Sequence, residues 1–231
     1  MTDNITYLSP NGQNVTFGTG TVTRMLIGTI EGVVTLDRKL RGKPWVETAR
    51  GLDGLHVSSL LFEPNSGKLF AGCHGDGGLW VSEDGGGVDW RRLENGLGHA
   101  HIYSLTARNI GGAVTLFAGT SPAALYRSAD LGANWTEITS LNAVPGSDKW
   151  TFIPPPHHPH VKNIVFHPTD PATFFVLVEQ GALLKTTDDG ATWTELDGYS
   201  SPSDTQWHEV HRLMIHPHDP DLMYLATGEG L

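Results

Sequence analysis

Histidines in this 231-residue sequence recur at positions that could bind ligands or transfer protons. The densest stretch is PPPHHPHVKNIVFHP, residues 154–168, with four histidines and five prolines. Neutral imidazole is a common metal ligand, and its pKa near neutrality suits general acid and base chemistry. Prolines restrict the loop before the apolar run and lower the entropy lost when it is ordered. We therefore predict a stiff loop that carries His157 and His158, with either a structural or a binding role for both.

The elements that position such residues follow from an internal repeat. Three segments read Ser/Thr-x-Asp-x-Gly and then Trp: SEDGGGVDW from Ser82, SADLGANW from Ser128 and TTDDGATW from Thr186. Asp accepts backbone N–H groups within its own turn, Gly tolerates positive φ, and Trp buries a large ring as the next strand begins. We assign a structural role to these turn residues, which are Asp84, Gly86, Trp90, Asp130, Gly132, Trp135, Asp188, Gly190 and Trp193.

Short apolar runs before each turn have the length and composition of β-strands. KLFAG and GLWVS precede the first turn, for example, and LHVSSLLFEP precedes that pair. TRMLIGTIEGVVTL, residues 23–36, fits the second and third strands of a similar unit, with Trp45 at the start of the fourth. Four antiparallel strands in about 45–50 residues make one β-propeller blade. The repeat therefore predicts an all-β fold.

The three turns resemble those of the BNR or Asp-box repeat proteins. This superfamily contains sialidase-like, sortilin-like and photosystem II assembly-factor-like β-propellers, and proteins labelled WD40/YVTN/BNR-like or glycosyl-hydrolase-like. The resemblance implies about four to five blades here, of six to eight in a closed propeller, and we expect a C-terminally truncated fragment. The expected parts are an N-terminal extension at 1–20, a partial blade at 21–50, blades at 51–97, 98–140 and 156–198, a loop insertion at 141–159 and a partial blade at 205–231.

Strand order within a blade would gather several side chains on one face. If strands are lettered A to D from the channel outward, B–C turns and D–A loops share this face, and the Asp-box turns lie on the other. The residue before strand A is His56, His101, His160 or Glu209, and His211 points the same way as Glu209 by strand alternation. The B–C turns add Glu31, His74 or Asp76, Glu179 and Glu229, and the enlarged D–A loops add Trp150, Phe152, Tyr199 and Trp207.

Binding is the function that we favour for this face. A propeller scaffold could bind a protein, a peptide or a carbohydrate-like small ligand there through its histidines, carboxylates and aromatic rings. The alternative is a glycoside hydrolase, which needs a carboxylate acid/base pair. Its carboxylates would come from Glu31, Glu179, Glu209 and Glu229.

A lyase or hydrolase that uses histidine and a divalent metal is a further alternative. His101 or His160 would be the general base, and His101, His160 and His211 the metal ligands, with Glu209 or Glu179 completing the set. Neither HExxH nor a paired CxxC is present. True sialidase activity is disfavoured because TFIPP at Thr151 lacks the Arg of the Phe/Tyr-Arg-Ile-Pro stretch found in sialidases.

Charge and composition argue against other classes of protein. The formal net charge of -10 disfavours nucleic acid, which requires a basic patch. No apolar run approaches the roughly 20 residues that span a bilayer. The N-terminal MTDNITYLSPNGQN lacks the features of a secretory signal, and the single Cys73 cannot form an internal disulfide. We therefore expect a cytoplasmic protein with no nucleic-acid or membrane partner.

Overall fold

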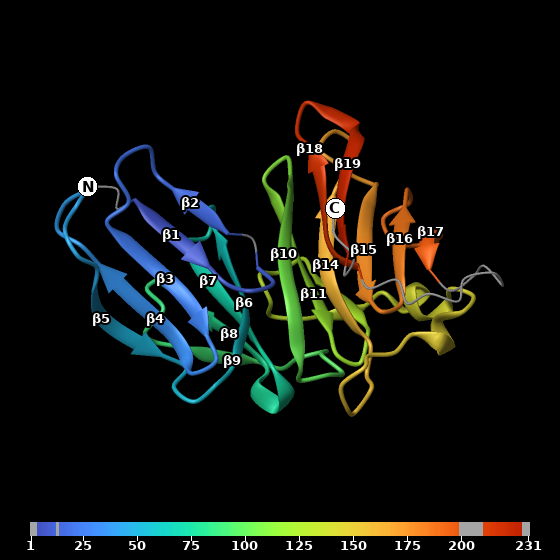
Figure 1. The fold of residues 1–231 in the computed structure, drawn as a ribbon, viewed down its shortest axis with the longest axis horizontal. Coiled ribbons are helices and arrows are strands. Elements are labelled where there is room, and N and C mark those ends of the chain that lie inside the picture. Colours follow the sequence, from blue (N-terminus) through green and yellow to red (C-terminus); the bar gives the residue numbers. More distant parts are fainter. Residues whose placement is uncertain (1–3, 13, 199–209, 228–231) are drawn as a thin grey trace. The chain divides into compact units, whose positions relative to one another are not determined.

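The computed structural model is built almost entirely of β-strands, and it describes residues 4–12, 14–198 and 210–227. Three short 3-10 helices, Gly75–Gly77, Thr139–Ala143 and Ser147–Lys149, lie in connections between strands (Figure 1). The chain divides into two compact units, Met1–Ala107 and Arg108–Leu231. Within the described ranges, no helix is long and apolar enough to cross a membrane. The predicted all-β fold with four-stranded antiparallel sheets is confirmed.

The first unit contains two sheets. One has five strands in the order β2-β1-β3-β4-β5, and the other has four in the order β6-β7-β8-β9. Neighbouring strands are antiparallel except β1 and β3, which run parallel. The strands are β1 (Ile5–Leu8), β2 (Val15–Phe17), β3 (Arg24–Thr29), β4 (Gly32–Asp37), β5 (Val46–Gly51), β6 (Val57–Glu63), β7 (Lys68–Cys73), β8 (Leu79–Ser82) and β9 (Arg91–Leu93).

The second unit repeats the four-stranded pattern. Its sheets have the orders β10-β11-β12-β13, β14-β15-β16-β17 and β18-β19, and β10 begins before the boundary between the units. Consecutive strands joined by short turns give the meander of a propeller blade. The strands are β10 (Ile102–Ile110), β11 (Ala113–Thr120), β12 (Leu125–Ser128), β13 (Thr136–Glu137), β14 (His160–Phe166), β15 (Phe174–Glu179), β16 (Ala182–Thr186), β17 (Thr194–Gly198), β18 (Val210–His216) and β19 (Asp219–Thr227).

The N-terminal residues belong to a sheet, contrary to the extension predicted at 1–20. Strands β1 and β2 form a hairpin, and β1 pairs with β3 in the place where a blade would carry strand A. Tyr7 is 2% exposed and stacks on Phe62 with ring centroids 4.7 Å apart, while Phe17 meets both rings edge-on. This hairpin has no Asp-box turn, so the repeat could not reveal it. Aromatic packing holds it on the first unit.

The three Asp-box turns follow β8, β12 and β16, as predicted. In each, the Ser or Thr hydroxyl that ends the strand donates to the Asp Oδ1, at 2.9, 2.8 and 2.8 Å in chain order. The same oxygens accept backbone N–H groups, for example that of Thr192 at 2.8 Å from Asp188. Hydrogen bonds from Asn134 and Thr192 lower the pKa values of Asp130 and Asp188 to about 2. These contacts give the carboxylates a structural role.

The first turn is one residue longer than the other two, and the structure places the extra residue before the glycine that bonds the strand-ending hydroxyl. Gly132 and Gly190 have positive φ and donate their N–H groups to the Ser or Thr hydroxyl, both at 2.9 Å. In the first turn Gly87, at φ 71°, makes this contact at 3.2 Å. Gly86 instead donates to Asp84 at 2.8 Å. The alignment of Gly86 with the other two glycines is therefore corrected to Gly87.

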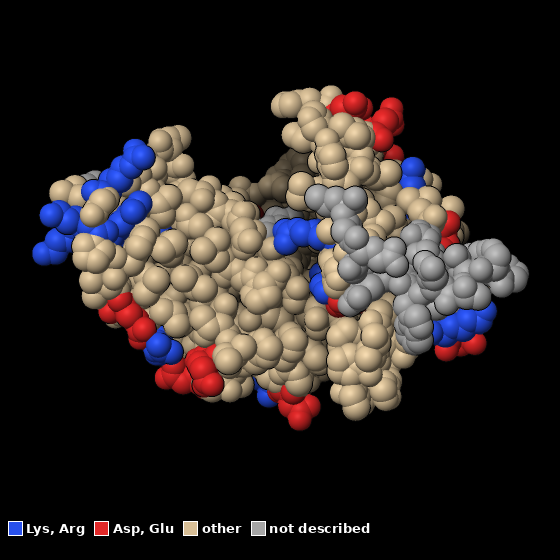
Figure 2. Space-filling view, viewed as in Figure 1, with Lys and Arg blue, Asp and Glu red and all other residues tan. Residues whose placement is uncertain are grey.

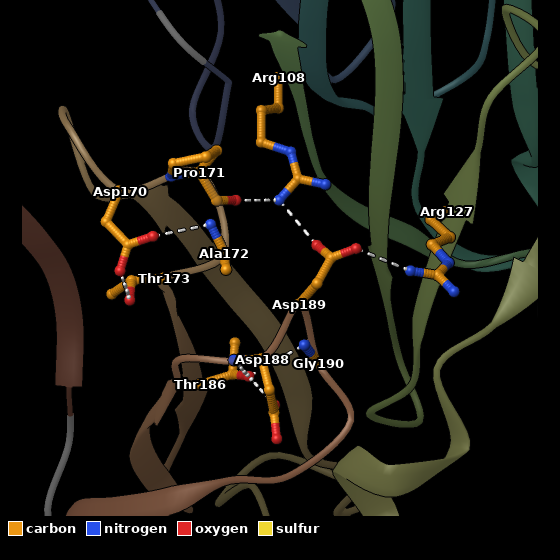
Figure 3. A network of polar contacts seen from close by, with 10 residues as sticks. All are labelled: Arg108, Arg127, Asp170, Pro171, Ala172, Thr173, Thr186, Asp188, Asp189 and Gly190. Carbon is orange, nitrogen blue, oxygen red and sulfur yellow. Dashed lines mark hydrogen bonds and ion pairs between the residues drawn. The ribbon is translucent and has the colours of Figure 1, made fainter.

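An arginine joins two sheets within the second unit (Figure 3). Arg108, at the end of β10, donates from Nη1 to the carbonyl of Pro171 at 2.6 Å and lies 2.7 Å from a carboxylate oxygen of Asp189. Its guanidinium also lies 5.3 and 5.5 Å from the ring centroids of Phe117 and Phe166. The side chain is only 11% exposed. One cation thus links the Asp-box turn after β16 to the preceding blade.

Candidate functional site

A buried carboxylate and imidazole lie side by side where β15 ends and β14 begins. Glu179 and His160 are direct partners in the antiparallel register of these strands, so their side chains lie close together. His160 Nε2 lies 2.5 Å from Glu179 Oε2, and the two side chains are 2% and 4% exposed. Both residues belong to the face that is predicted to carry the B–C turns and the residues before strand A. The structure therefore brings together a residue predicted to precede strand A and a residue predicted in the B–C turn.

Lys162 and His211 complete this group, which we call the Glu179 cluster. Lys162 Nζ donates to Glu179 Oε1 at 2.5 Å and to His211 Nδ1 at 2.9 Å. His211 Nδ1 also lies 3.0 Å from that carboxylate oxygen. Lys162 is 18% exposed and His211 is 34% exposed, so the basic side of the cluster reaches the surface.

A repeated β-bulge positions these two basic side chains. The register of β14 shifts between Val161 and Asn163, and that of β18 shifts between Val210 and Arg212. Lys162 and His211 are the bulged residues, and a bulge redirects a side chain relative to simple alternation. Our prediction for His211 relied on alternation alone, and it missed Lys162. A signal was present, because both residues occupy the same position after the Val that opens strand A.

The Glu179 cluster holds its carboxylate in the ionised form. Burial alone would raise the pKa of Glu179, but hydrogen bonds from His160 and Lys162, together with their charges, outweigh burial and lower it. Because the carboxylate is ionised, His160 donates its Nε2 hydrogen to it. Glu179 can therefore accept protons or organise donors, but it is poorly suited to be the protonated acid of a glycosidase.

The loop before β14 covers part of the cluster. The ring of Phe152 meets His160 edge-on with centroids 4.6 Å apart, and the Phe152 carbonyl lies 3.0 Å from His157 Nδ1. His157 thus orders the loop, whereas His158 is exposed. Trp150 corrects our prediction of a ligand-facing ring, because it is 7% exposed and belongs to the core of the second unit. The ring packs against the backbone of Gly181, just before β16, where an added Cβ would lie 2.9 Å from Trp150 Cγ.

The first unit gathers a second set of predicted residues. His56 and His74 stack with centroids 4.0 Å apart and planes at 18°, and His101 lies 4.5 Å from His74. Tyr103 adjoins both His74 and His101 at 5.1 and 5.7 Å. Stacked rings carry their nitrogens in nearly parallel planes, so the lone pairs of His56 and His74 do not converge. This arrangement suits packing on a flat group better than coordination of an ion.

Metal binding gains no support from either set. Among the residues that the structure describes, no three His, Cys, Asp or Glu side chains are placed to hold a metal ion. In the Glu179 cluster, His160 and His211 both face the carboxylate, but the ammonium of Lys162 stands at the same oxygen as His211. A cation there would be repelled by Lys162. The predicted ligand His101 belongs to the first unit.

The other predicted residues are placed as follows. Glu31 is exposed in the turn between β3 and β4, where its N–H bonds the Thr29 hydroxyl at 3.1 Å. Asp76 lies in the 3-10 helix after β7, and its carbonyl accepts a bond from Arg92 at 3.1 Å. Tyr199, Trp207, Glu209 and Glu229 lie outside the described residues. Within the described ranges, Glu179 is thus the predicted carboxylate that is buried, whereas Glu31 and Asp76 are exposed.

Solved structures match the fold. No protein-family model matches the chain, and no curated protein is similar in sequence. A GH74 enzyme from Niastella koreensis has a TM-score of 0.58 at 20% identity, over 96% of this chain and 33% of that one. YCF48 bound to a D1 peptide has a TM-score of 0.56 at 13% identity, over 94% of this chain and 66% of that one. The GH74 xyloglucanase from Xanthomonas campestris has a TM-score of 0.53 at 18% identity, over 88% of this chain and 35% of that one.

These likenesses establish a β-propeller fold for the chain. The chain spans about a third of the two GH74 enzymes and 66% of the YCF48 chain, so it corresponds to part of each of them. The set includes enzymes and a peptide-binding protein on one architecture. Fold alone does not decide between these functions. The choice depends on the Glu179 cluster.

Proposed function

We propose that this β-propeller chain is a binding module that takes a peptide segment of a protein partner on the face that carries the Glu179 cluster. One observation carries the proposal: a buried, ionised carboxylate fixes two basic side chains at a partly exposed surface. Lys162 and His211 are 18% and 34% exposed, whereas Glu179 is 4% exposed. The carboxylate is thus a support, and the basic groups are what a ligand would meet.

The chemistry of these groups favours a peptide. Lysine offers three N–H donors, and histidine offers a ring N–H, so both complement carbonyl and carboxylate oxygens. Ile153, in the loop beside the cluster, is 64% exposed and would give a peptide side chain an apolar contact. Donors next to apolar surface are a usual composition for a binding site on a rigid scaffold. The solved complex of YCF48 with a D1 peptide gives a precedent for this fold.

Glycoside hydrolysis is the second candidate, because two of the similar structures are GH74 enzymes. Hydrolysis needs one carboxyl group that is protonated and one that is ionised. The contacts of Glu179 with His160 and Lys162 keep its pKa low, so it could act only as the nucleophile or base. The geometry therefore supports binding better than hydrolysis.

Parallel arrays test the proposal. Wild-type protein would be applied to immobilised peptides of varied sequence and to immobilised oligosaccharides, and also incubated with xyloglucan and aryl β-glucosides. We expect peptide binding that weakens in Lys162→Met and in His211→Phe but not in Lys185→Met, which alters a partly exposed lysine beside the Asp-box turn after β16. Sugar release that disappears in Glu179→Gln, with no peptide bound, would instead establish the glycosidase.

A further inference from the structure

Positive charge is concentrated in one connection of this acidic protein. Residues 38–43, which join β4 to β5, read RKLRGK and include four basic residues and no acidic one, although the whole chain carries a formal charge of -10. In Figure 2, Lys and Arg gather at the left end of the view, where Figure 1 shows the first sheet of the first unit. A run of basic residues creates a local positive potential, whereas an even mixture of positive and negative charges does not.

A cavity opens beside this run. Its volume is about 640 Å³, and its walls include Leu40, Pro44 and Val46 together with the stems of Lys39 and Lys43. Leu40 is 65% exposed and Val46 is 57% exposed, so apolar surface faces solvent there. A second cavity of about 560 Å³ adjoins it, because Arg38 lines both, and Arg41 lines the second. We call this apolar hollow with its positive rim the basic cleft.

Two arginines that line the basic cleft, Arg24 and Arg38, make contacts within the first unit. Arg24 makes a bidentate pair with Asp37 at 2.8 and 3.1 Å. Arg38 donates to the Val22 carbonyl at 2.8 Å and lies 4.3 Å from the centroid of the Trp45 ring. Both are therefore fixed by contacts within the unit, and they hold the connection in place.

The remaining three cations of this run are Lys39, Arg41 and Lys43. Among residues 4–12, 14–198 and 210–227, no carboxylate forms an ion pair with Lys39, Arg41 or Lys43. All three are exposed. Like charges this close together repel one another, so an anionic group placed among them is favoured.

The edge of the sheet adds a geometric preference. β5 is the last strand in the order β2-β1-β3-β4-β5, so one side of its backbone is unpaired within that sheet. An extended peptide can add to such an edge through main-chain hydrogen bonds, with alternate side chains seated in neighbouring pockets. A flat anionic membrane fits less well, because Leu40 and Val46 line a hollow.

We propose that the basic cleft binds an extended acidic peptide that carries a bulky apolar side chain. The apolar side chain fills the cavity beside Leu40 and Val46, and the acidic side chains meet Lys39, Arg41 and Lys43. The peptide backbone lies along β5. This site belongs to the first unit and does not depend on the Glu179 cluster of the second.

Fluorescence anisotropy with three labelled peptides of equal length tests the proposal. The probes alternate acidic and aromatic residues, acidic residues and serine, or lysine and aromatic residues. The variant Lys39→Gln/Lys43→Gln is compared with Lys149→Gln/Lys185→Gln, which changes the net charge equally in the second unit. We expect the first probe to bind best, and its affinity to fall about tenfold in the cleft variant and little in the control.

Further outcomes separate the alternatives. Leu40→Ser should weaken the acidic-aromatic probe but not the acidic-serine probe, and added salt should weaken both because exposed charges are screened. Equal binding of the two acidic probes would overturn the apolar part of the proposal. Binding to phosphatidylserine vesicles without binding to either acidic peptide, or no binding at all, would overturn it entirely. Lys162→Met should leave the acidic-aromatic probe bound, which distinguishes this site from the Glu179 cluster.

Discussion

Glu179 is the residue on which the candidate site depends. Its carboxylate contacts His160, Lys162 and His211 at 2.5, 2.5 and 3.0 Å, and it is almost fully buried. Removing the charge of Glu179 would leave its buried partners without a compensating charge. The positions of His160 and Glu179 on one face could be predicted from the repeat. Lys162 could not, because a bulge overrides the alternation from which side-chain direction is predicted.

Glu179→Gln should destabilise the fold. The amide keeps the size of the side chain but removes the charge that compensates Lys162, so we expect the free energy of unfolding to fall by about 3 kcal/mol. Chemical denaturation at neutral pH measures it. Glu47→Gln, which alters an exposed pair with Arg50, is the control and should change little. Equal effects of the two substitutions would show that the cluster contributes nothing special.

The stability conferred by Glu179 should depend on pH in one direction. Its pKa in the folded protein is below the ordinary value of 4.5. The contribution is therefore fully present above that value and is lost as the pH falls through the folded pKa. Denaturation of wild type and Glu179→Gln at a series of pH values should give a constant gap near neutrality that narrows below about pH 4.5. A difference in the free energy of unfolding that grows as the pH falls would contradict the predicted direction of the pH dependence.

At the scale of the elements, the turns could be predicted from the sequence, whereas the packing between distant strands could not. The three Asp-box turns place their strands as predicted, since Asp, Gly and hydroxyl residues satisfy the turn locally. The hairpin of β1 and β2 was not predicted, because its stacking of Tyr7 on Phe62 joins residues far apart in sequence. Local chemistry is visible in one sequence, whereas packing between distant segments is not.

Asp188→Ala should loosen its turn selectively. Asp188 accepts the Thr192 N–H at 2.8 Å, so hydrogen exchange at the Thr192 amide should become faster. Exchange within β14 should stay unchanged, because that strand is held by its own ladder. The pKa of Asp188 is lowered to about 2, so the stabilisation is lost as the pH falls from the ordinary value of 3.8 towards 2. Unchanged exchange at Thr192 would contradict a structural role for the carboxylate.

Arg108→Lys should weaken the link between two sheets of the second unit (Figure 3). Lysine cannot keep the bond to Pro171, the pair with Asp189 and the contacts with the Phe117 and Phe166 rings together. We expect unfolding to become easier by about 1.5 kcal/mol. Arg127→Lys is the control, because Arg127 is 44% exposed and meets Asp189 at 3.2 Å. Thermal melting of both variants measures the difference, and equal melting temperatures would exclude the link.

At the scale of the whole molecule, the chain carries its candidate site on a β-propeller scaffold. The fold class was predictable, because a repeat with a turn motif specifies blades. The function was not, because similar propellers include GH74 enzymes and a peptide-binding protein. The Glu179 cluster gives the physical reason to choose binding, since its carboxylate supports basic groups at the surface and is not kept protonated.

The affinity of one array-selected peptide for wild type and for Lys162→Met tests the central claim most directly. Isothermal titration would be performed on both proteins, with Lys185→Met, beside the Asp-box turn after β16, as the matched control. Our account predicts that Lys162→Met loses about tenfold or more in affinity while the control binds as wild type does. Equal affinity of all three proteins would show that the peptide binds elsewhere, and it would contradict the assignment of this face as the binding site.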